Sequence, residues 1–216
     1  MTECSGTRIK VCGITRPEDA EAVARVGAHA LGLNFVVSSP RAVGIATAAE
    51  IAGQVEGRLQ RIALFADSGI AEVEQVLRSV DIDLLQFHGA EPGALCRSFG
   101  LPYMKVVSVG RNPIDLSLLA EEYPDACLLL LDTYIPGQAG GTGRPFDWSL
   151  WPQRSPWPLV LAGGLTPDNV EAAIRLTHPF GVDVAGGVEG PVKGVKDPDR
   201  LARFVAAVHA ADRRDS

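Results

Sequence analysis

Short apolar runs alternate with helical patterns along this chain, and this alternation constrains the fold more than any other feature. Runs of four to six apolar or β-branched residues, bounded by Gly, Pro or Asp, indicate buried strands. Between them, apolar residues recur at helical spacing, as they do over residues 70–80 and 201–208. Eight strand-then-helix units predict an α/β fold, a single (βα)8 TIM barrel of parallel strands with outer helices. The strands are expected at residues 9–12, 30–35, 61–65, 83–87, 103–107, 127–132, 159–163 and 181–184.

An open, doubly wound sheet is the alternative fold. Such a sheet usually has a G-x-G-x-x-G turn after its first strand, whereas here that turn reads Cys12-Gly13-Ile14-Thr15. Nothing in the 216 residues resembles a linker, so one barrel domain over residues 1–216 is expected. The longest connections, residues 36–46 and 133–148, follow strands two and six, at the end of the barrel where active sites are built.

Four helix starts are indicated by capping residues. Thr15 and Thr47 are each expected to act as the N-cap of a capping box. Thr166-Pro167 and Asp197-Pro198 each place a capping residue before a proline at the first helical position.

Charge and cysteine content exclude several classes of protein. The 20 basic and 26 acidic residues give a net charge of -6 without a basic stripe, which argues against nucleic-acid binding. No apolar run approaches the roughly 20 residues that span a bilayer, and the first residues do not resemble a signal peptide. Because the four cysteines form no C-x-x-C pair, neither a zinc site nor a disulfide framework is expected. The same cysteine content predicts a protein of the reducing cytoplasm. The four histidines form no cluster with carboxylates, so no metal is expected.

Strand parity predicts a polar barrel interior. Side chains alternate between the two faces of a strand, which assigns Val106 to the helix side. Buried charges must pair or bind a ligand, because an isolated buried charge is very costly. For Lys105 and Asp183 a structural ion network is as good an interpretation as a functional one, whereas Cys12 and Asp132 end their strands and favour function. The inward set is Lys10, Cys12, Asn34, Gln86, His88, Lys105, Asp132 and Asp183.

Four further features suggest ligand contacts or catalysis. Gly163-Gly164 and Gly186-Gly187 follow strands seven and eight, the usual phosphate position of such barrels. Arg41, in the second loop, could bind a carboxylate, although a solvated loop arginine is the ordinary alternative. Lys10, two residues before Cys12, is expected to favour the thiolate by its positive charge. The sixth loop, at 137–143, is rich in glycine and could fold over a ligand.

Together these segments resemble the phosphoribosylanthranilate isomerase family of tryptophan biosynthesis, from Lys10 to about Asp197. LQFHG at 85–89 is similar to the family's Q-L-H-G, with Phe87 in the leucine position. The most specific matches are KVCGIT (10–15), SPR (39–41), LLLDT (129–133), GGTGRPFDW (140–148), LAGGL (161–165) and GVDV (181–184), followed by GVE and KD.

The resemblance implies a metal-free and cofactor-free Amadori rearrangement of N-(5-phosphoribosyl)anthranilate. It implies Asp132 as general acid, Cys12 as general base and Arg41 as the ligand of the anthranilate carboxylate. Gly141, Gly164, Gly186 and Gly187 complete the expected substrate-binding set, the last three at the phosphate. Ala162 and Ala185 stand where the family often has serine, so activity with a weaker hold on the phosphate is expected.

Two other functions remain open. The related isomerase of histidine biosynthesis performs the same rearrangement on an aminoimidazole ribotide, but that family has an aspartate base on its first strand and resembles a doubled half-barrel. A non-catalytic barrel that binds a phosphorylated metabolite would fit if Cys12 and Asp132 were structural. The expected partner is a small-molecule substrate, with no nucleic acid and no membrane, and the chain is expected to be a monomer or homodimer.

Overall fold

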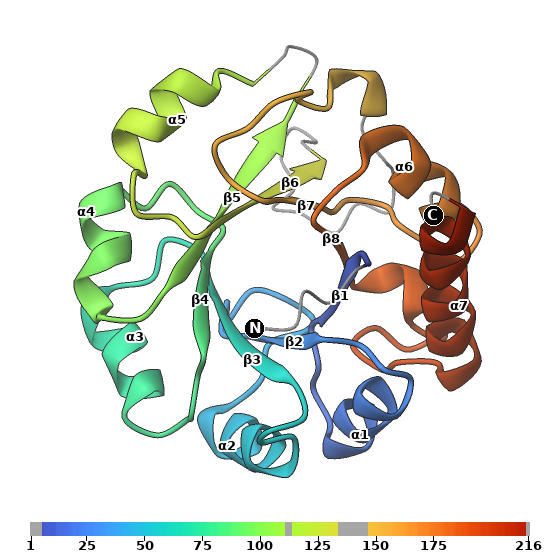
Figure 1. The fold of residues 1–216 in the computed structure, drawn as a ribbon. Helices are drawn as coiled ribbons and strands as arrows, with labels where there is room; N and C mark the ends of the chain where they lie inside the picture. The colour runs from blue at the N-terminus through green and yellow to red at the C-terminus, as the bar shows by residue number, and fades with distance from the viewer. Residues whose placement is uncertain (1–5, 111–113, 134–146, 215–216) are drawn as a thin grey trace.

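Eight parallel strands close into a barrel, in which each strand pairs with the next along the chain and β8 pairs with β1 (Figure 1). The computed structural model describes residues 6–110, 114–133 and 147–214. The predicted TIM barrel is confirmed, and each predicted strand is present with ends shifted by no more than a few residues. The strands are β1 (Arg8–Cys12), β2 (Ala30–Asn34), β3 (Gln60–Phe65), β4 (Leu84–Phe87), β5 (Tyr103–Val109), β6 (Leu128–Thr133), β7 (Leu159–Leu161) and β8 (Gly181–Val184).

Helices surround the barrel on its outside (Figure 1). The described residues between β6 and β7 hold only a 3-10 turn, so the helix expected there is not found in that part of the connection. The α-helices are α1 (Pro17–Arg25), α2 (Ile45–Gln54), α3 (Ile70–Leu77), α4 (Gly93–Cys96), α5 (Leu116–Glu122), α6 (Val170–Thr177) and α7 (Pro198–Arg214). The 3-10 turns are η1 (Arg97–Phe99), η2 (Trp148–Leu150) and η3 (Gly186–Val188).

Three of the four predicted helix starts are wrong by one or more residues. Helix α1 has Arg16, not Thr15, as its N-cap, because Pro17 forces the residue before it into an extended conformation. The hydroxyl of Thr15 instead donates to the carbonyl of Gly194, at 2.8 Å. Helix α2 begins at Ile45 after the extended Gly44, which places Thr47 inside the helix.

The two predicted Pro-containing starts have different outcomes. Asp197 does cap α7, since its carboxylate accepts from the N–H groups of Asp199 and Arg200. Thr166 lies in a turn ahead of α6, and that helix begins only at Val170, with Asn169 as its N-cap. The carbonyl of Thr166 accepts from the N–H groups of Asn169 and Val170, so the turn leads directly into the helix.

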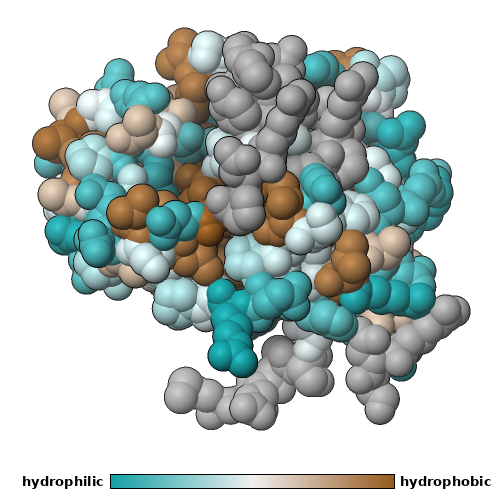
Figure 2. All heavy atoms as spheres, turned by 90° about the horizontal axis from the view of Figure 1, so that it is seen from above, coloured by the Kyte–Doolittle hydropathy of each residue, from teal (hydrophilic) through white to brown (hydrophobic). Residues whose placement is uncertain are grey.

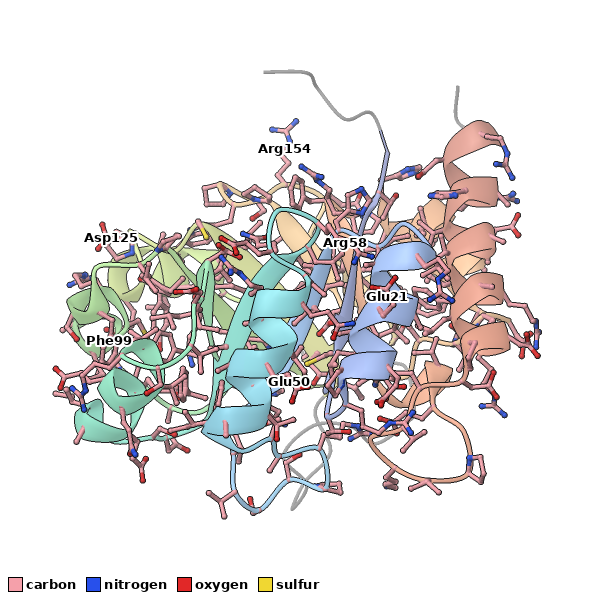
Figure 3. The ribbon with its side chains drawn as sticks, turned by 90° about the horizontal axis from the view of Figure 1, so that it is seen from below. Glu21, Glu50, Arg58, Phe99, Asp125 and Arg154 are labelled. Carbon is pink, nitrogen blue, oxygen red and sulfur yellow. The ribbon has the colours of Figure 1, made fainter. Side chains whose placement is uncertain are left out.

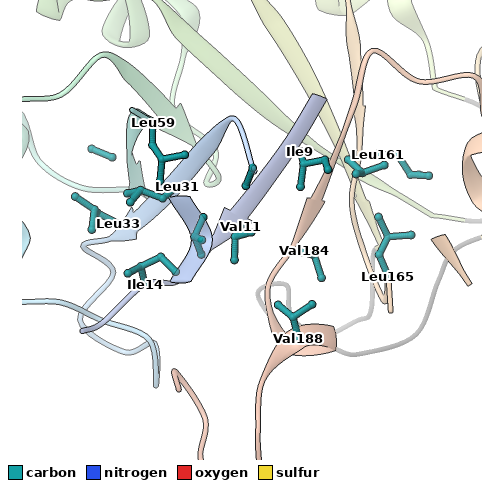
Figure 4. Close-up of a cluster of buried hydrophobic side chains, with 14 of the residues drawn as sticks. Ile9, Val11, Ile14, Leu31, Leu33, Leu59, Leu161, Leu165, Val184 and Val188 are labelled. Atoms are coloured by element: carbon teal, nitrogen blue, oxygen red, sulfur yellow. The ribbon is translucent and has the colours of Figure 1, made fainter. Parts of the chain in front are cut away.

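The main hydrophobic core lies between the strands and the helices (Figure 4). Leu165 and Val188, from the loops after β7 and β8, join it and so fix those loops on the barrel. Each fully buried aliphatic side chain contributes about 1.5–3 kcal/mol. A smaller apolar cluster fills the barrel interior and comprises Ala30, Ile62, Leu84, Met104, Val106, Leu130, Val160 and Ala162.

The strand parity predicted for β5 is wrong. Val106 belongs to the interior cluster, so Lys105 points outward, where its Nζ lies 2.9 Å from the Glu91 carboxylate and 5.6 Å from the centre of the Tyr123 ring. Lys105 also donates to the carbonyl of Gly89 at 2.6 Å and thereby holds the loop after β4. The error arises because YMKVV has apolar residues on both faces, so polarity alone does not show which face is inside.

The outer surface is mixed in character. Figure 3 shows Glu21 of α1 near Arg58, and the carboxylate and guanidinium are 2.8 Å apart. Exposed pairs of this kind contribute little to stability. On the face seen in Figure 2, hydrophobic residues stand in separate groups among hydrophilic ones. Among the described residues, no helix combines the length and apolar character needed to cross a bilayer.

Candidate active site

Cys12 is the last residue of β1 and Asp132 the next-to-last residue of β6, and both lie at the same end of the barrel because all eight strands are parallel. Both are buried, each with 7% of its surface exposed. Cys12 pairs with Gly32 of β2, where a Cβ would lie 2.8 Å from the Cys12 sulfur and 3.1 Å from Lys10 Nζ. Only glycine leaves room there for both groups, so Gly32 allows the thiol and the ammonium group to pack side by side.

A buried ion pair lies beneath the thiol. Lys10 Nζ is 2.9 Å from a carboxylate oxygen of Asp183, its partner on β8. Burial by itself would lower the pKa of Lys10, but the charges of Asp183 and Cys12 hold it above its ordinary value, so the group stays positive. Burial raises the pKa of Cys12, and Lys10 offsets only part of this rise. The predicted influence of Lys10 therefore has the right sign, but desolvation outweighs it.

Asp132 faces a histidine from β4. One of its oxygens accepts from the Thr133 N–H at 2.7 Å, and the other lies 3.5 Å from His88 Nε2. Burial raises the pKa of Asp132 to about 6, although the Thr133 hydrogen bond opposes the rise. Burial and the charge of Lys10 lower the pKa of His88, so the imidazole is neutral. Asp132 can therefore gain and lose a proton close to neutral pH.

Arg41 belongs to the long loop after β2, and its side chain lies against the residue that follows Cys12. Its stem packs against Gly13, where a Cβ would lie 2.5 Å from Arg41 Cδ, and its Nη2 lies near Gly186. Its Nε and Nη2 donate to the two carboxylate oxygens of Glu189, at 2.6 and 2.9 Å. Only 12% of the side chain is exposed, unlike that of a solvated loop arginine.

Sequence reasoning missed Glu189 and Lys196 as members of the site. Lys196 Nζ donates to the carbonyls of Cys12 and Ala185 and to Glu189, at 2.7, 3.1 and 3.2 Å. The signal in the sequence is the glutamate of GVE and the lysine of KD, the two segments after strand eight that contribute to the family resemblance.

The two glycine pairs lie close together at this end of the barrel. Gly187 packs directly against the carbonyl of Leu165, which joins the loops after β7 and β8. Gly163 and Gly164 have φ of 85° and 64°, and neither of their N–H groups donates to another described residue. Backbone N–H groups of this kind suit an anion. Gly141 and the rest of 134–146 lie outside the described residues.

The candidate site thus combines a thiol, a carboxyl group that titrates near neutrality, a held arginine and a glycine-rich corner. The residues the structure describes include no group of three His, Cys, Asp or Glu side chains arranged to hold a metal ion. Proton transfer on a ligand with anionic groups is the chemistry that these side chains can perform.

Comparison with known proteins shows the family of this chain. The family model for N-(5'phosphoribosyl)anthranilate (PRA) isomerase matches residues 9–207. The N-(5'-phosphoribosyl)anthranilate isomerase of Pseudomonas aeruginosa (strain LESB58) is 49% identical over 208 residues, which cover 96% of this chain and 97% of the relative.

Solved structures agree in fold over nearly the whole chain. The crystal structure of phosphoribosyl anthranilate isomerase from Thermotoga maritima is similar with a TM-score of 0.84 and 35% identity, over 94% of this chain and 99% of that one. A structure of such an isomerase in complex with reduced 1-(o-carboxyphenylamino)-1-deoxyribulose 5-phosphate has a TM-score of 0.79 and 32% identity, with the same coverage. The chain is therefore an isomerase that belongs to the N-(5'-phosphoribosyl)anthranilate isomerase family.

Proposed function

We propose that this chain converts N-(5'-phosphoribosyl)anthranilate into 1-(o-carboxyphenylamino)-1-deoxyribulose 5-phosphate, a step of L-tryptophan biosynthesis, with Asp132 as general acid and Cys12 as general base. The observation that carries the proposal is the pair of buried strand-end groups, a carboxyl with a pKa of about 6 and a thiol beside the ammonium groups of Lys10 and Lys196. They come from β1 and β6, which are not neighbours in the barrel, so a ligand between them can be approached from two sides.

The reaction needs one proton delivered and one removed. Asp132 protonates the furanose ring oxygen, the bond between that oxygen and C1 breaks, and the anthranilate nitrogen forms an iminium with C1. The Cys12 thiolate then removes the proton from C2, and the electrons of the C2–H bond form the C1–C2 double bond of an enolamine. Loss of the enol proton and protonation at C1 give the ketone. Positioned acids and bases of this kind contribute about 10²–10⁴-fold each.

The protonation states of the pair agree with this scheme. At neutral pH most molecules carry the proton on Cys12 and a charge on Asp132, because the thiol has the higher pKa. The reactive form has the proton on Asp132 and therefore holds the same total number of protons. The fraction of molecules in this reactive form is therefore constant at any pH between the pKa of Asp132 and the pKa of Cys12, since moving a proton from one group of the pair to the other does not depend on pH.

The proposal extends to the contacts with the substrate. Arg41 binds the anthranilate carboxylate, and the loops containing Gly164, Gly186 and Gly187 bind the phosphate, with Gly141 as a further contact. A ligand with both anionic groups, a carboxyphenyl and a phosphate, occurs in the complex of the related isomerase. Ala162 and Ala185 offer no hydroxyl, so backbone amides hold the phosphate. The proposed reaction needs no cofactor, and both a monomer and a homodimer are compatible with a site built from one chain.

The direct test is turnover of the purified chain with N-(5'-phosphoribosyl)anthranilate, followed by loss of its fluorescence. We expect a kcat on the order of 1–10³ s⁻¹, the usual range for enzymes. The aminoimidazole ribotide of histidine biosynthesis serves as the competing substrate. Binding without turnover would support a non-catalytic barrel instead, and faster conversion of the ribotide would support the histidine-pathway reaction.

Gly163 offers a test of how the loop after β7 supports Asp132. A Cβ at Gly163 would overlap the Thr133 hydroxyl and lie 2.9 Å from Asp132 Oδ1, whereas Gly57 has a similar positive φ of 70° and no atom within 4 Å. Gly57→Ala therefore adds only backbone strain of about 1–2 kcal/mol. We expect Gly163→Ala to lower the Tm by about 4 °C or more beyond that control, and kcat by about tenfold or more. Equal Tm values and unchanged kcat for the two variants would show that Gly163 does not position the acid.

A further inference from the structure

Two of the N–H groups of the Arg41 guanidinium already donate to another residue of the protein. Glu189 takes the Nε–H and one N–H of Nη2 in a two-point contact. Arginine has five N–H groups in a fixed plane, so three remain, on Nη1 and on the free position of Nη2. Those two nitrogens form the end of the fork, which can hold a second carboxylate with two parallel hydrogen bonds.

Glu189 is itself held in place. It is buried, with 5% of its surface exposed, and it also accepts from Lys196, whose side chain is fully buried. Burial alone would raise the pKa of Glu189, but the hydrogen bonds from Arg41 and the charge of Lys196 hold it below its ordinary value, so it stays ionised. Through Lys196 the carboxylate is tied to the carbonyls of Cys12 and Ala185, at the ends of β1 and β8.

The stem of Arg41 has little freedom either. Gly13 lies against its Cβ, Cγ and Cδ, and Gly186 lies against Nη2. Only 12% of the side chain is exposed. The side chain is therefore packed between the residue after Cys12 and the first residue of η3, and Glu189 sets the rotation of its guanidinium plane.

We propose that Glu189 is a positioning residue for carboxylate recognition: it fixes the guanidinium of Arg41 so that the Nη1–Nη2 end faces the ligand beside Cys12. Arg41, Glu189 and Lys196 together carry one net positive charge, which suits a ligand with one carboxylate at this point. The inference rests on the proposed function, because it assigns the substrate carboxylate to Arg41.

The test compares two ligands on the intact protein by calorimetry. One is reduced 1-(o-carboxyphenylamino)-1-deoxyribulose 5-phosphate, and the other is the same molecule without the o-carboxylate. The wild-type protein should prefer the carboxylated ligand by about 100-fold, the effect of a desolvated bidentate charge pair. Glu189→Gln keeps the size of the side chain but offers only one oxygen, so the preference should fall by about tenfold or more. Affinity for the ligand without the carboxylate should change by less than about threefold.

Two further variants complete the design. Glu189→Asp keeps the charge on a shorter stem, should give an intermediate preference, and serves as the test if the Gln variant does not fold. Glu21→Gln removes a carboxylate from an exposed arginine pair and should leave the preference unchanged. An unaltered preference in Glu189→Gln, or in Glu189→Asp if the Gln variant does not fold, would overturn the inference alone. Failure of the wild-type protein to bind the carboxylated ligand would count against the proposed function itself.

Discussion

Replacing Asp132 with Asn is expected to lower kcat by about 10³-fold or more, the upper part of the range for a lost general acid, while making the folded protein more stable above pH 6. Asparagine has nearly the same shape and can still accept from the Thr133 N–H, but it has no proton to deliver to a ring oxygen. The loss should appear in kcat and in kcat/KM alike, because the interaction removed exists only in the transition state.

The gain in stability follows from the raised pKa of Asp132. Burial moves that pKa from 3.8 to about 6, so the ionised carboxylate is disfavoured in the folded chain. Below about pH 4 both folded and unfolded chains keep the proton, and the carboxyl costs nothing. As the pH rises from about 4 to 6, the unfolded chain ionises first, and the folded chain loses about 3 kcal/mol of stability that it does not regain at higher pH.

Denaturant unfolding at several pH values measures this effect. Asp132→Asn should exceed the wild-type free energy of unfolding by up to about 3 kcal/mol at pH 8, and the difference should vanish below pH 4. Asp183→Asn is the matched control, because it removes a buried carboxylate that neutralises Lys10 and should destabilise the protein by about 3–5 kcal/mol. A loss of stability in both variants, or turnover by Asp132→Asn within tenfold of wild type, would contradict the assignment.

Replacing Cys12 with Ala should lower kcat by about 10²–10⁴-fold, because no other described group at that strand end can take the C2 proton. Cys12→Ser preserves the size of the side chain but should lose nearly as much activity, since a hydroxyl ionises far less readily than a thiol. Cys96 supplies the control, because it is also buried, but its thiol lies on α4 beside the carbonyl of Glu91.

The expected contrast is measured by steady-state turnover of the three variants. Cys96→Ala should keep kcat within about threefold of wild type even if the small cavity lowers its Tm. Comparable losses in the Cys96 and Cys12 variants would show that the effect at Cys12 comes from packing and not from the loss of a base.

The barrel could be predicted from sequence because buried parallel strands appear as continuous apolar runs. The same property explains why the direction of the Lys105 side chain was predicted wrongly. Both faces of β5 carry apolar residues, so the sequence shows no alternation that would tell the barrel interior from the helix side. The predicted start of α1 was wrong because a neighbouring residue sets the backbone conformation there: Pro17 keeps Arg16 extended. Asp197 was predicted correctly because its cap depends only on the next three residues.

Only those residues of the candidate site that lie near the ends of strands could be predicted from the sequence, because the end of a strand is visible in the local pattern. Cys12 and Asp132 stand out because each closes an apolar run. Lys196 does not stand out in the sequence, since the residue whose carbonyl it contacts, Cys12, lies 184 positions away in the chain. The space beside Gly32 and the burial that shifts the pKa values of Cys12 and Asp132 are also set by the folded barrel, and no local pattern encodes them.

Cleavage of the C2–H bond tests the central claim most directly. The substrate labelled with deuterium at C2 is incubated with wild-type protein and with Cys12→Ala, in which Asp132 is intact, and NMR follows loss of the label from C2. The wild-type protein should remove the label once per turnover. Cys12→Ala should remove it about 100-fold more slowly or worse, although its acid can still open the ring. Loss of the label by Cys12→Ala within about threefold of the wild-type rate would contradict the assignment of Cys12 as the base.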